Sequence, residues 1–265
     1  IISTFLINST VRTAIKKIKK INKEFDEKEF NKIRKKIDFE LTNDQLTSIN
    51  QINNDLKSNQ KMFRLLQGDV GSGKTIVALI ASMNVISSGF QVSFMAPTEI
   101  LAKQHFNLAN NLFDKKVNIK LLTSKTDQRE RREILKDIYN NKINILIGTH
   151  SLFQDKIKYY NLGLIIIDEQ HKFGVKQRKR LSDKGGKNCD VLVMSATPIP
   201  RTMIMTVFGD MDCSVIKSKP KNRKEIKTFS KIETKLDEVI KFITMQVKLK
   251  NQVFWVCPLI EESKK

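Results

Sequence analysis

The sequence predicts a doubly wound α/β domain, in which a parallel sheet carries helices on both of its faces. The main observation is that short apolar runs alternate with segments of helical length and spacing, such as Thr75–Ser88 and Thr98–Phe113. Several runs are nearly continuous in Ile, Leu and Val, as expected of strands that are covered on both sides. The predicted strands are Phe63–Leu66, Gln91–Met95, Asn118–Leu122, Asn144–Ile147, Gly163–Ile167 and Val191–Met194.

Composition is that of a soluble globular enzyme, with 40% hydrophobic and 29% charged residues over 265 positions. No stretch approaches the roughly 20 apolar residues of a membrane span. The net charge of +20 favours a polyanionic partner, nucleic acid ahead of anionic lipid, although a Lys-, Asn- and Ile-rich chain also arises from genome base composition. Cys189, Cys213 and Cys257 are far apart and are expected to be small core side chains in a reducing, bacterial cytoplasmic setting.

The two ends of the chain differ from its centre. Residues 1–39 are predicted to be a basic helical connector, with Ile15, Ile18 and Ile21 at helical spacing between lysines; a solvated helix face is favoured over an arm near DNA. Residues 217–227 are polar and form a predicted linker. A helix near Glu233–Lys250 and a strand at Val253–Cys257 follow, which we interpret as the start of a second α/β lobe. The first residue is not Met, so we expect a fragment.

The segment after the first predicted strand is a full match to a phosphate-binding loop. Glycines let the backbone wrap a phosphate, so that consecutive N–H groups point at its oxygens. A helix that begins near Lys74 adds the positive end of its dipole. Lys74 is expected to reach the β- and γ-phosphates, and the Thr75 hydroxyl to bind Mg²⁺. The predicted nucleotide-binding residues of the loop are Gly68, Asp69, Val70, Gly71, Ser72, Gly73, Lys74 and Thr75.

Two adjacent carboxylates, Asp168 and Glu169, follow the apolar run Gly163–Ile167. Ligands of open α/β sheets lie at the carboxyl ends of the strands. Asp168 is therefore predicted to hold Mg²⁺, and Glu169 to orient and deprotonate an attacking water. An Asp–Glu pair alone is more often a charge pair at a helix start, but the phosphate loop upstream favours hydrolysis. The predicted catalytic residues are Lys74, Asp168 and Glu169.

The segment Ser195–Pro198 also ends an apolar run. Its small hydroxyl side chains are suited to hydrogen-bond a γ-phosphate network. Without the other two segments, an ordinary Ser/Thr turn before proline would be the favoured interpretation.

Together these segments resemble motifs I, II and III of superfamily 2 helicases, which implies a RecA-like P-loop NTPase domain over residues 40–216. The segment Phe39–Gln45 resembles the upstream motif whose Gln recognises adenine, which implies that role for Gln45. The resemblance also implies that a further group couples hydrolysis to lobe movement. The residues of this group are Gln170, His171, Ser195 and Thr197.

Two more segments resemble helicase motifs that face the DNA strand. Ala96–His105 is similar to motif Ia, and Gly148–His150 to motif Ib. Contacts with DNA, mostly through phosphates, are therefore implied for a set of residues on these motifs. They are Pro97, Thr98, Gln104, Gly148, Thr149 and His150.

A narrower resemblance, to RecG-type helicases, is carried by Asp168–Val175, Pro198–Thr202 and Trp255–Ser263. It implies an ATP- and Mg²⁺-dependent DNA helicase or translocase that remodels forks and Holliday-type junctions in recombination and repair, without a stable protein partner. Residues 1–39 would be the tail of an upstream wedge domain, and residues 217–265 the linker and start of the second RecA-like lobe.

Three alternatives stay open at this point. The transcription–repair coupling factor shares the run Pro198–Thr202, but that family usually has Phe where Ser72 stands and Glu where Gln170 stands. An RNA helicase and, for this chain alone, a non-catalytic ATP- and DNA-binding module are the others. In the family the second lobe supplies an arginine worth about 10³–10⁵ in rate, so the chain alone is expected to turn over poorly.

Smaller signals are weaker. The histidines His105, His150 and His171 lack metal-site spacing. Phe173 is equally a base-stacking or a core aromatic. A solvated helix face is favoured over phosphate contact for three arginines, namely Arg129, Arg131 and Arg132.

Overall fold

The computed structural model describes residues 20–153, 156–169, 186–197, 211–218 and 227–256. The chain divides into two compact units, residues 1–221 and residues 222–265, which are described separately below. No helix among the described residues combines the length and the apolarity that crossing a bilayer requires.

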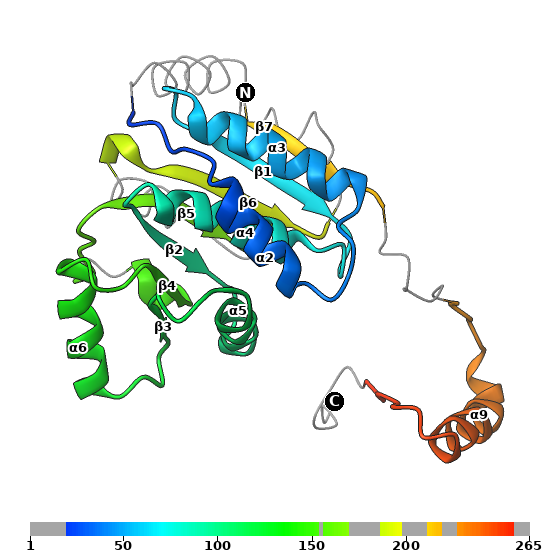
Figure 1. Ribbon diagram of the computed structural model, residues 1–265. Helices are drawn as coiled ribbons and strands as arrows, with labels where there is room; N and C mark the ends of the chain where they lie inside the picture. The colour runs from blue at the N-terminus through cyan, green and yellow to red at the C-terminus, as the bar shows by residue number, and fades with distance from the viewer. Residues whose placement is uncertain (1–19, 154–155, 170–185, 198–210, 219–226, 257–265) are drawn as a thin grey trace, which may run out of the picture. The chain divides into compact units, whose positions relative to one another are not determined.

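The first unit is built on one seven-stranded sheet, in the order β3-β4-β2-β5-β6-β1-β7, in which all neighbouring strands are parallel (Figure 1). All six predicted strands are present within one or two residues of their expected ends. The strands are β1 (Phe63–Gly68), β2 (Gln91–Met95), β3 (Ile119–Leu122), β4 (Ile145–Gly148), β5 (Leu162–Ile167), β6 (Asp190–Ser195) and β7 (Asp212–Ile216).

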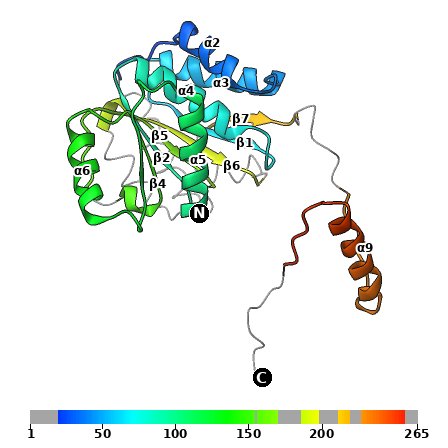
Figure 2. The same cartoon turned by 60° about the horizontal axis from the view of Figure 1, so that its bottom comes forward.

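Side chains alternate between two cores, one on each face of the sheet. Leu164 and Ile166 of β5 point into one core, whereas Ile165 and Ile167 point into the other. The first core is covered by α2, α3, α4 and α5, and the second receives α6 and η1 (Figures 1 and 2). The helices are α2 (Glu27–Lys36), α3 (Asn43–Lys57), α4 (Lys74–Ser87), α5 (Glu99–Leu112) and α6 (Gln128–Tyr139), with the 3₁₀ turns η1 (His150–Phe153) and η3 (Gly186–Asn188).

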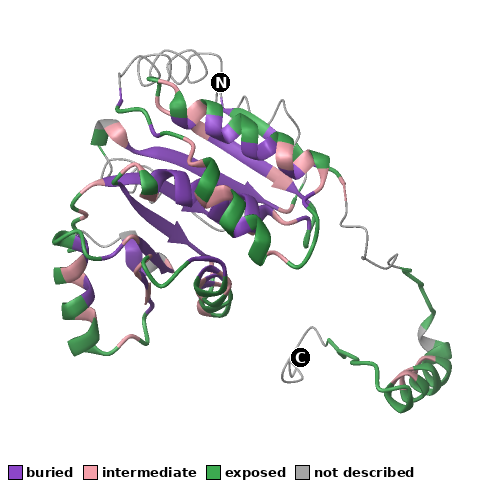
Figure 3. Ribbon diagram, in the orientation of Figure 1, coloured by how far each residue is buried: buried purple, intermediate pink, exposed green. Residues whose placement is uncertain are grey.

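Two-sided cover explains the continuous apolar runs. Every residue of β2, β4, β5 and β6 is buried, so neither face of these strands tolerates the alternation of a half-exposed sheet (Figure 3). The predicted α/β fold is therefore confirmed, and its physical basis is the burial of the four central strands.

The edge strand β7 was not predicted. It pairs with β1, from Arg64 opposite Asp212 to Gly68 opposite Ile216, and its outer positions are exposed. Cys213 lies on this edge and is exposed, so the expectation that it is a core residue is wrong; Cys189 is buried as expected. Cys257 lies outside the described residues.

The second unit contains η4 (Glu233–Lys235) and α9 (Leu236–Lys248), close to the predicted helix. Residues 253–256 do not form the predicted strand, because a strand requires a hydrogen-bonded neighbour and the described residues of this unit provide none. No residue of α9 is buried. Its apolar side chains and those that follow are exposed, including Ile240, Phe242, Met245, Phe254 and Trp255.

Residues 20–26, here called the strap, run to the start of α2 without regular structure. The ammonium groups of Lys20 and Lys23 each lie 2.6 Å from a carboxylate oxygen of Asp190, and all three side chains are fully buried. The same carboxylate accepts a hydrogen bond of 2.7 Å from the Met62 backbone N–H. The expectation of a solvated helical face is therefore wrong for Lys20 and Lys23, because an aspartate at the amino end of β6 draws them inward.

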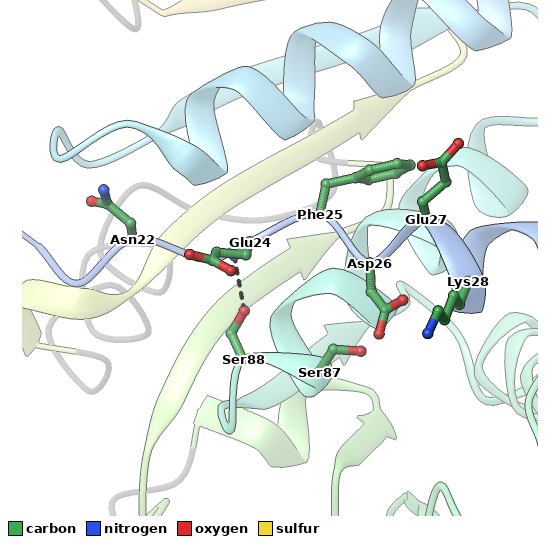
Figure 4. A pocket seen from close by; sticks show the side chains of 8 residues that line it. All are labelled: Asn22, Glu24, Phe25, Asp26, Glu27, Lys28, Ser87 and Ser88. Carbon is green, nitrogen blue, oxygen red and sulfur yellow. Dashed lines mark hydrogen bonds between the residues drawn. The ribbon is translucent and has the colours of Figure 1, made fainter.

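Between the strap and the carboxyl-terminal end of α4 lies a hollow of about 590 Å³ (Figure 4). The backbone N–H of Glu24 donates to the Ser88 hydroxyl there at 3.0 Å. The hollow is at the opposite end of α4 from Lys74, and therefore away from the predicted phosphate loop. Its lining residues are Asn22, Glu24, Phe25, Asp26, Glu27, Lys28, Ser87 and Ser88.

Replacing Asp190 with Asn would remove the principal counter-charge of two buried ammonium groups. We expect the free energy of unfolding of the first unit to fall by about 3–5 kcal/mol, measured by urea unfolding at pH 7. Lys20→Met is the matched control, because it removes one of two cations and leaves a one-to-one pair. We expect it to change the free energy by less than about 1 kcal/mol. If Asp190→Asn and Lys20→Met lose the same free energy of unfolding, the charge balance between the two lysines and Asp190 does not determine the stability.

The difference in stability between the wild type and Lys20→Met is expected to depend on pH. Burial lowers the pKa of Lys20 below its usual 10.5, and the attraction of Asp190 only partly opposes this. The folded protein therefore releases this proton at lower pH than the unfolded chain does, and the cost of burying the ammonium shrinks as the pH rises. If Lys20→Met has a higher free energy of unfolding than the wild type at pH 7, we expect that difference to become smaller between pH 7 and pH 10.

Candidate nucleotide-binding site

Three predicted site segments leave the same edge of the sheet from neighbouring strands. Strands β5, β6 and β1 are adjacent, with Ile167 opposite Val193 and Gln67 opposite Ser195. The loop Gly68–Gly73, the carboxylates Asp168 and Glu169, and Ser195 therefore meet at the carboxyl ends of these strands. Parallel pairing, not proximity in sequence, brings them together, as in other open α/β sheets.

The loop itself requires glycine where the sequence has it. Gly73 precedes α4 in the left-handed region, at φ 87°, where glycine pays no Cβ penalty. A Cβ atom at this position would also overlap the side-chain amide of Gln45. Helix α4 begins at Lys74, so its free N–H groups and the positive end of its dipole face the loop.

Lys74 is folded onto its own loop. Its ammonium donates to the carbonyl oxygens of Gly68 at 2.6 Å and of Asp69 at 3.1 Å. Burial lowers the pKa of Lys74, while the nearby charges of Asp168, Glu169 and Asp69 act in the opposite direction. A bound phosphate would add negative charge beside this ammonium and would favour its charged form.

Gln45 lies beneath the loop and is fully buried. Its side-chain oxygen accepts from the Thr42 backbone N–H at 2.8 Å, and its side-chain nitrogen donates to the Ser72 carbonyl at 2.8 Å. The first bond is half of a capping box at the start of α3. Adenine recognition by Gln45 stays a prediction, and the contacts seen here give Gln45 a second role as an anchor of the loop.

The carboxylate pair shows one buried and one strained residue. Asp168 is buried, its backbone N–H donates to the Met95 carbonyl at 2.9 Å, and its side chain lies 2.8 Å from His105 Nε2. Glu169 is half-buried and has φ 50°, a left-handed conformation that costs a residue with a Cβ atom roughly 1 kcal/mol or more. Non-glycine residues with such backbone strain are often found at functional sites.

The remaining predicted coupling residues are only partly described. The Ser195 hydroxyl lies 3.0 Å from the Thr197 hydroxyl and donates to the Thr197 carbonyl at 3.2 Å, so the two close a local turn. Gln170 and His171 lie outside the described residues, as does Phe173.

The edge fits a nucleotide with one divalent cation. The Ser72 hydroxyl is buried and has no hydrogen-bond partner among the residues that the structure describes, which is the state expected of a donor reserved for a ligand. No group of three or more His, Cys, Asp or Glu side chains suited to a metal occurs in the described part of the chain. Mg²⁺ needs no such cage, because it usually takes one or two protein ligands plus phosphate and water. Thr75 and Asp168 stay the predicted protein ligands of Mg²⁺.

The segments predicted to face DNA occupy the neighbouring part of the same edge. Strands β4 and β2 are adjacent, and the Ala96 N–H donates to the Gly148 carbonyl at 2.9 Å. Thr98 caps α5 through its hydroxyl, and Gln104 is exposed on that helix. A Cβ atom at Gly148 would overlap the Leu122 carbonyl oxygen, so glycine allows β3 and β4 to approach. Thr149 leads into η1, which begins at His150.

Two site contacts were missed from the sequence. Asp44, next to Gln45 on α3, accepts hydrogen bonds from the Lys217 N–H (2.9 Å), the Ser218 N–H (2.7 Å) and the Ser218 hydroxyl (2.5 Å). It thus fastens the start of the predicted linker beside the nucleotide edge. The second is the His105–Asp168 contact. Neither partner pair is close in sequence, but the spacing of Ala102, His105 and Ala109 already places His105 on the buried face of a helix.

A glycine-rich loop at a helix start, a buried aspartate with an adjacent glutamate, and a parallel sheet that presents both at one edge define a P-loop nucleotide-binding domain. The chain belongs to the DEAD/DEAH box helicase family, whose pattern matches residues 42–206.

Comparison with individual proteins confirms the similarity to RecG-type helicases. The chain is 47% identical over 253 residues to the ATP-dependent DNA helicase RecG of Aquifex aeolicus, which covers 95% of this chain and 32% of that protein. It is 47% identical over 246 residues to RecG of Bacillus subtilis, covering 92% of this chain and 36% of the relative. The chain therefore spans about a third of the length of these relatives.

Solved structures agree. A structure of RecG bound to a three-way DNA junction superposes with a TM-score of 0.82 at 39% identity, covering 97% of this chain and 35% of that one. The DEAD-box helicase Mss116, solved with single-stranded RNA, superposes with a TM-score of 0.63 at 20% identity over 85% of this chain and 51% of that one, which shows the shared fold alone.

The hydrogen bonds of Asp44 are expected to protect the backbone amides of Lys217 and Ser218 from exchange with solvent. Asp44→Ala removes three hydrogen bonds, and we expect the amide protons of Lys217 and Ser218 to exchange at least about tenfold faster in hydrogen-exchange experiments. Asp38→Ala, an exposed aspartate just before α3, is the control and should leave both amides protected.

The same hydrogen bonds hold the pKa of Asp44 below its usual 3.8. Their contribution is therefore present above that pH and is lost as the pH falls through the lowered value. Unchanged exchange in Asp44→Ala would show that Lys217 and Ser218 are held by other contacts.

Proposed function

We propose that this chain is part of an ATP-dependent DNA helicase or translocase of the RecG type, which remodels branched DNA in recombination and repair in the bacterial cytoplasm. The observation that carries the proposal is the meeting of the phosphate loop and the carboxylate pair at the carboxyl ends of β1 and β5, the two parallel strands that flank β6, with the predicted DNA-facing motifs on the same edge. The 47% identity to bacterial RecG proteins supports the choice of DNA and of branched substrates.

On the nucleotide side, the backbone N–H groups of the loop and the start of α4 would hold the triphosphate of ATP. Lys74 would exchange its bonds to the loop carbonyls of Gly68 and Asp69 for bonds to the β- and γ-phosphates. The Ser72 hydroxyl, which has no hydrogen-bond partner within the described ranges, would gain one. Gln45 would keep the loop in place from below, and its proposed contact with adenine would require it to rearrange one of its two present bonds.

For hydrolysis, Glu169 is the proposed base that orients the attacking water. Asp168 and Thr75 would hold Mg²⁺, which when bound neutralises phosphate charge. Ser195, which ends β6 opposite Gln67, and Thr197, two residues further on, would sense the loss of the γ-phosphate.

On the DNA side, Pro97, Thr98 and Gln104 of motif Ia and Gly148, Thr149 and His150 of motif Ib are the proposed contacts. Both motifs follow strands on the side of β5 away from β1. A single strand could therefore lie along this part of the edge without covering the phosphate loop. Contacts to phosphate make such binding nearly independent of sequence.

We further propose that residues 217–265 are the linker and start of the second RecA-like lobe, and residues 1–39 the connector from an upstream wedge domain. The exposed apolar side chains of α9 and of residues 253–256 support this, because contiguous apolar surface of this kind normally marks a contact surface. In this proposal the remainder of the second lobe covers them.

The first experiment is Mg²⁺-ATP hydrolysis by the full-length protein encoded by the gene that carries this sequence, with and without forked DNA. Lys74→Ala is expected to abolish both nucleotide binding and turnover. Glu169→Gln removes the base but keeps the size of the side chain, so turnover should fall by about 10²–10⁴ while ATP-dependent thermal stabilisation persists.

Stimulation by forked DNA beyond that by linear duplex supports the RecG-type function. Stimulation by RNA, or by duplex regardless of branching, would instead support an RNA helicase or a coupling-factor-type translocase. Retained ATP binding without turnover under any condition would support a non-catalytic ATP-gated module. Loss of ATP binding in Glu169→Gln would contradict its assignment as a base.

DNA binding gives an independent test on the 265-residue chain. About four phosphate contacts to a single strand predict an affinity loss on the order of 50-fold between 50 and 200 mM salt. Gln104→Glu places a negative charge on the proposed DNA face and should weaken binding at low salt. Gln60→Glu makes the same change at the opposite edge of the sheet, just before β1, and should have little effect. Affinity that is insensitive to salt would exclude phosphate-dominated contact.

A further inference from the structure

The side chain of His105 joins helix α5 to the proposed metal-binding carboxylate. Its Nε2 atom lies 2.8 Å from Asp168 Oδ2, and both side chains are about nine-tenths buried. The imidazole ring stacks on Phe94 of β2, with ring centroids 4.7 Å apart and planes 28° from parallel. Packing therefore fixes the ring, and the hydrogen bond fixes one oxygen of the carboxylate.

The contact crosses the boundary between the two functional parts of the edge. Strand β5, which delivers Asp168, pairs with β6 and β1 on one side and with β2, which leads into motif Ia, on the other. Asp168 is tied to the β2–α5 segment twice, through its backbone N–H to the Met95 carbonyl at 2.9 Å and through its side chain to His105. The contact between His105 and the Asp168 side chain depends on the position of α5, whereas the hydrogen bond to Met95 belongs to the sheet.

Helix α5 carries the proposed DNA contacts on the same rigid element. Thr98 caps its first turn, and Gln104 is exposed immediately before His105 in the sequence. His105 belongs to the same helix as Gln104. A shift of α5 that accompanies DNA contact at Thr98 or Gln104 therefore also moves the His105 ring. A shift of a few tenths of an ångström is enough to lengthen or shorten a hydrogen bond of 2.8 Å.

We propose that His105 is a positioning residue that couples DNA engagement by motif Ia to the proposed Mg²⁺ ligand Asp168. This rests on the proposed function, in which Asp168 binds Mg²⁺ and α5 contacts DNA. Groups that hydrogen-bond a metal ligand and fix its orientation commonly change metal affinity by about 10–100-fold when they are removed. His105 supplies such a group from helix α5, the helix that also carries the proposed contacts with DNA.

A purely structural role would come from the ring, whereas the proposed role needs the nitrogen. His105→Phe keeps an aromatic ring against Phe94 and removes the bond to Asp168. His105→Gln and His105→Met form a second pair of similar size, of which only Gln retains a hydrogen-bonding group. Tyr159→Phe is the matched control, because it deletes a bond of 2.9 Å between a buried hydroxyl and Ser93 in the opposite core.

The experiment uses the full-length protein and a fluorescent ATP analogue, with binding measured across Mg²⁺ concentrations in the presence and absence of single-stranded DNA. Binding needs no turnover, so it reports on Asp168 independently of hydrolysis. For His105→Phe we expect the half-saturating Mg²⁺ concentration to rise about tenfold and the effect of DNA on it to disappear. His105→Gln should stay within about threefold of wild type, His105→Met should behave like His105→Phe, and Tyr159→Phe should match the wild type.

Several outcomes overturn the proposal. His105→Phe or His105→Met with wild-type Mg²⁺ dependence would show that the nitrogen does not position Asp168. A raised Mg²⁺ requirement with the DNA effect intact would assign His105 to the metal site without coupling. If His105→Phe does not fold, the Gln and Met variants decide between the same outcomes. Wild-type protein that binds no nucleotide at any Mg²⁺ concentration would instead contradict the proposed function itself.

Discussion

The parallel pairing of β2, β5, β6 and β1 at their carboxyl ends is the constraint on which the rest of this molecule depends. Because these strands are in register, Met95, Ile167, Val193 and Leu65 lie in one row across the sheet, and each strand releases its loop at the same edge. Burial on both faces fixes that register, since a slip by one residue would exchange the side chains of the two cores. The site is thus positioned by the core and not by the loops that carry its chemistry.

A buried aspartate lies at each edge of this sheet, Asp190 at the amino edge and Asp168 at the carboxyl edge, and the two differ in their contacts. At the amino edge, Asp190 is saturated by Lys20, Lys23 and the Met62 N–H, and it serves to fasten the strap. At the carboxyl edge, the described contacts of Asp168 are one from a carboxylate oxygen to His105 Nε2 and one from its backbone N–H to the Met95 carbonyl. A carboxylate that is fixed but not saturated is suited to bind a cation, whereas a saturated one is suited to hold the fold together.

Local sequence patterns were sufficient for whatever depends on neighbours along the chain. The six predicted strands, α4, α5 and the phosphate loop follow from apolar runs, helical spacing and glycine placement. The edge strand β7 was missed because its exposed face breaks the apolar run, and α3 was assigned only as a motif because Asn- and Gln-rich positions weaken its helical signal. The contacts of Lys20, Lys23, Asp44 and His105 were beyond local patterns, since each joins residues more than 60 positions apart.

The state of the nucleotide edge also follows from what it contacts within the protein. Lys74 donates to two carbonyls of its own loop, the buried Ser72 hydroxyl has no hydrogen-bond partner in the described part of the chain, and Glu169 has a left-handed backbone. Each of these arrangements is less favourable than an ordinary one: a buried lysine with a lowered pKa, an unmade hydrogen bond and a strained residue. They coincide at the carboxyl ends of β1 and β5, which flank β6, where the rigid sheet prevents the loops from relaxing independently. A bound triphosphate would satisfy the first two of these features together, so that part of the stabilisation expected on binding comes from removing costs already present in the protein, not from new contacts alone.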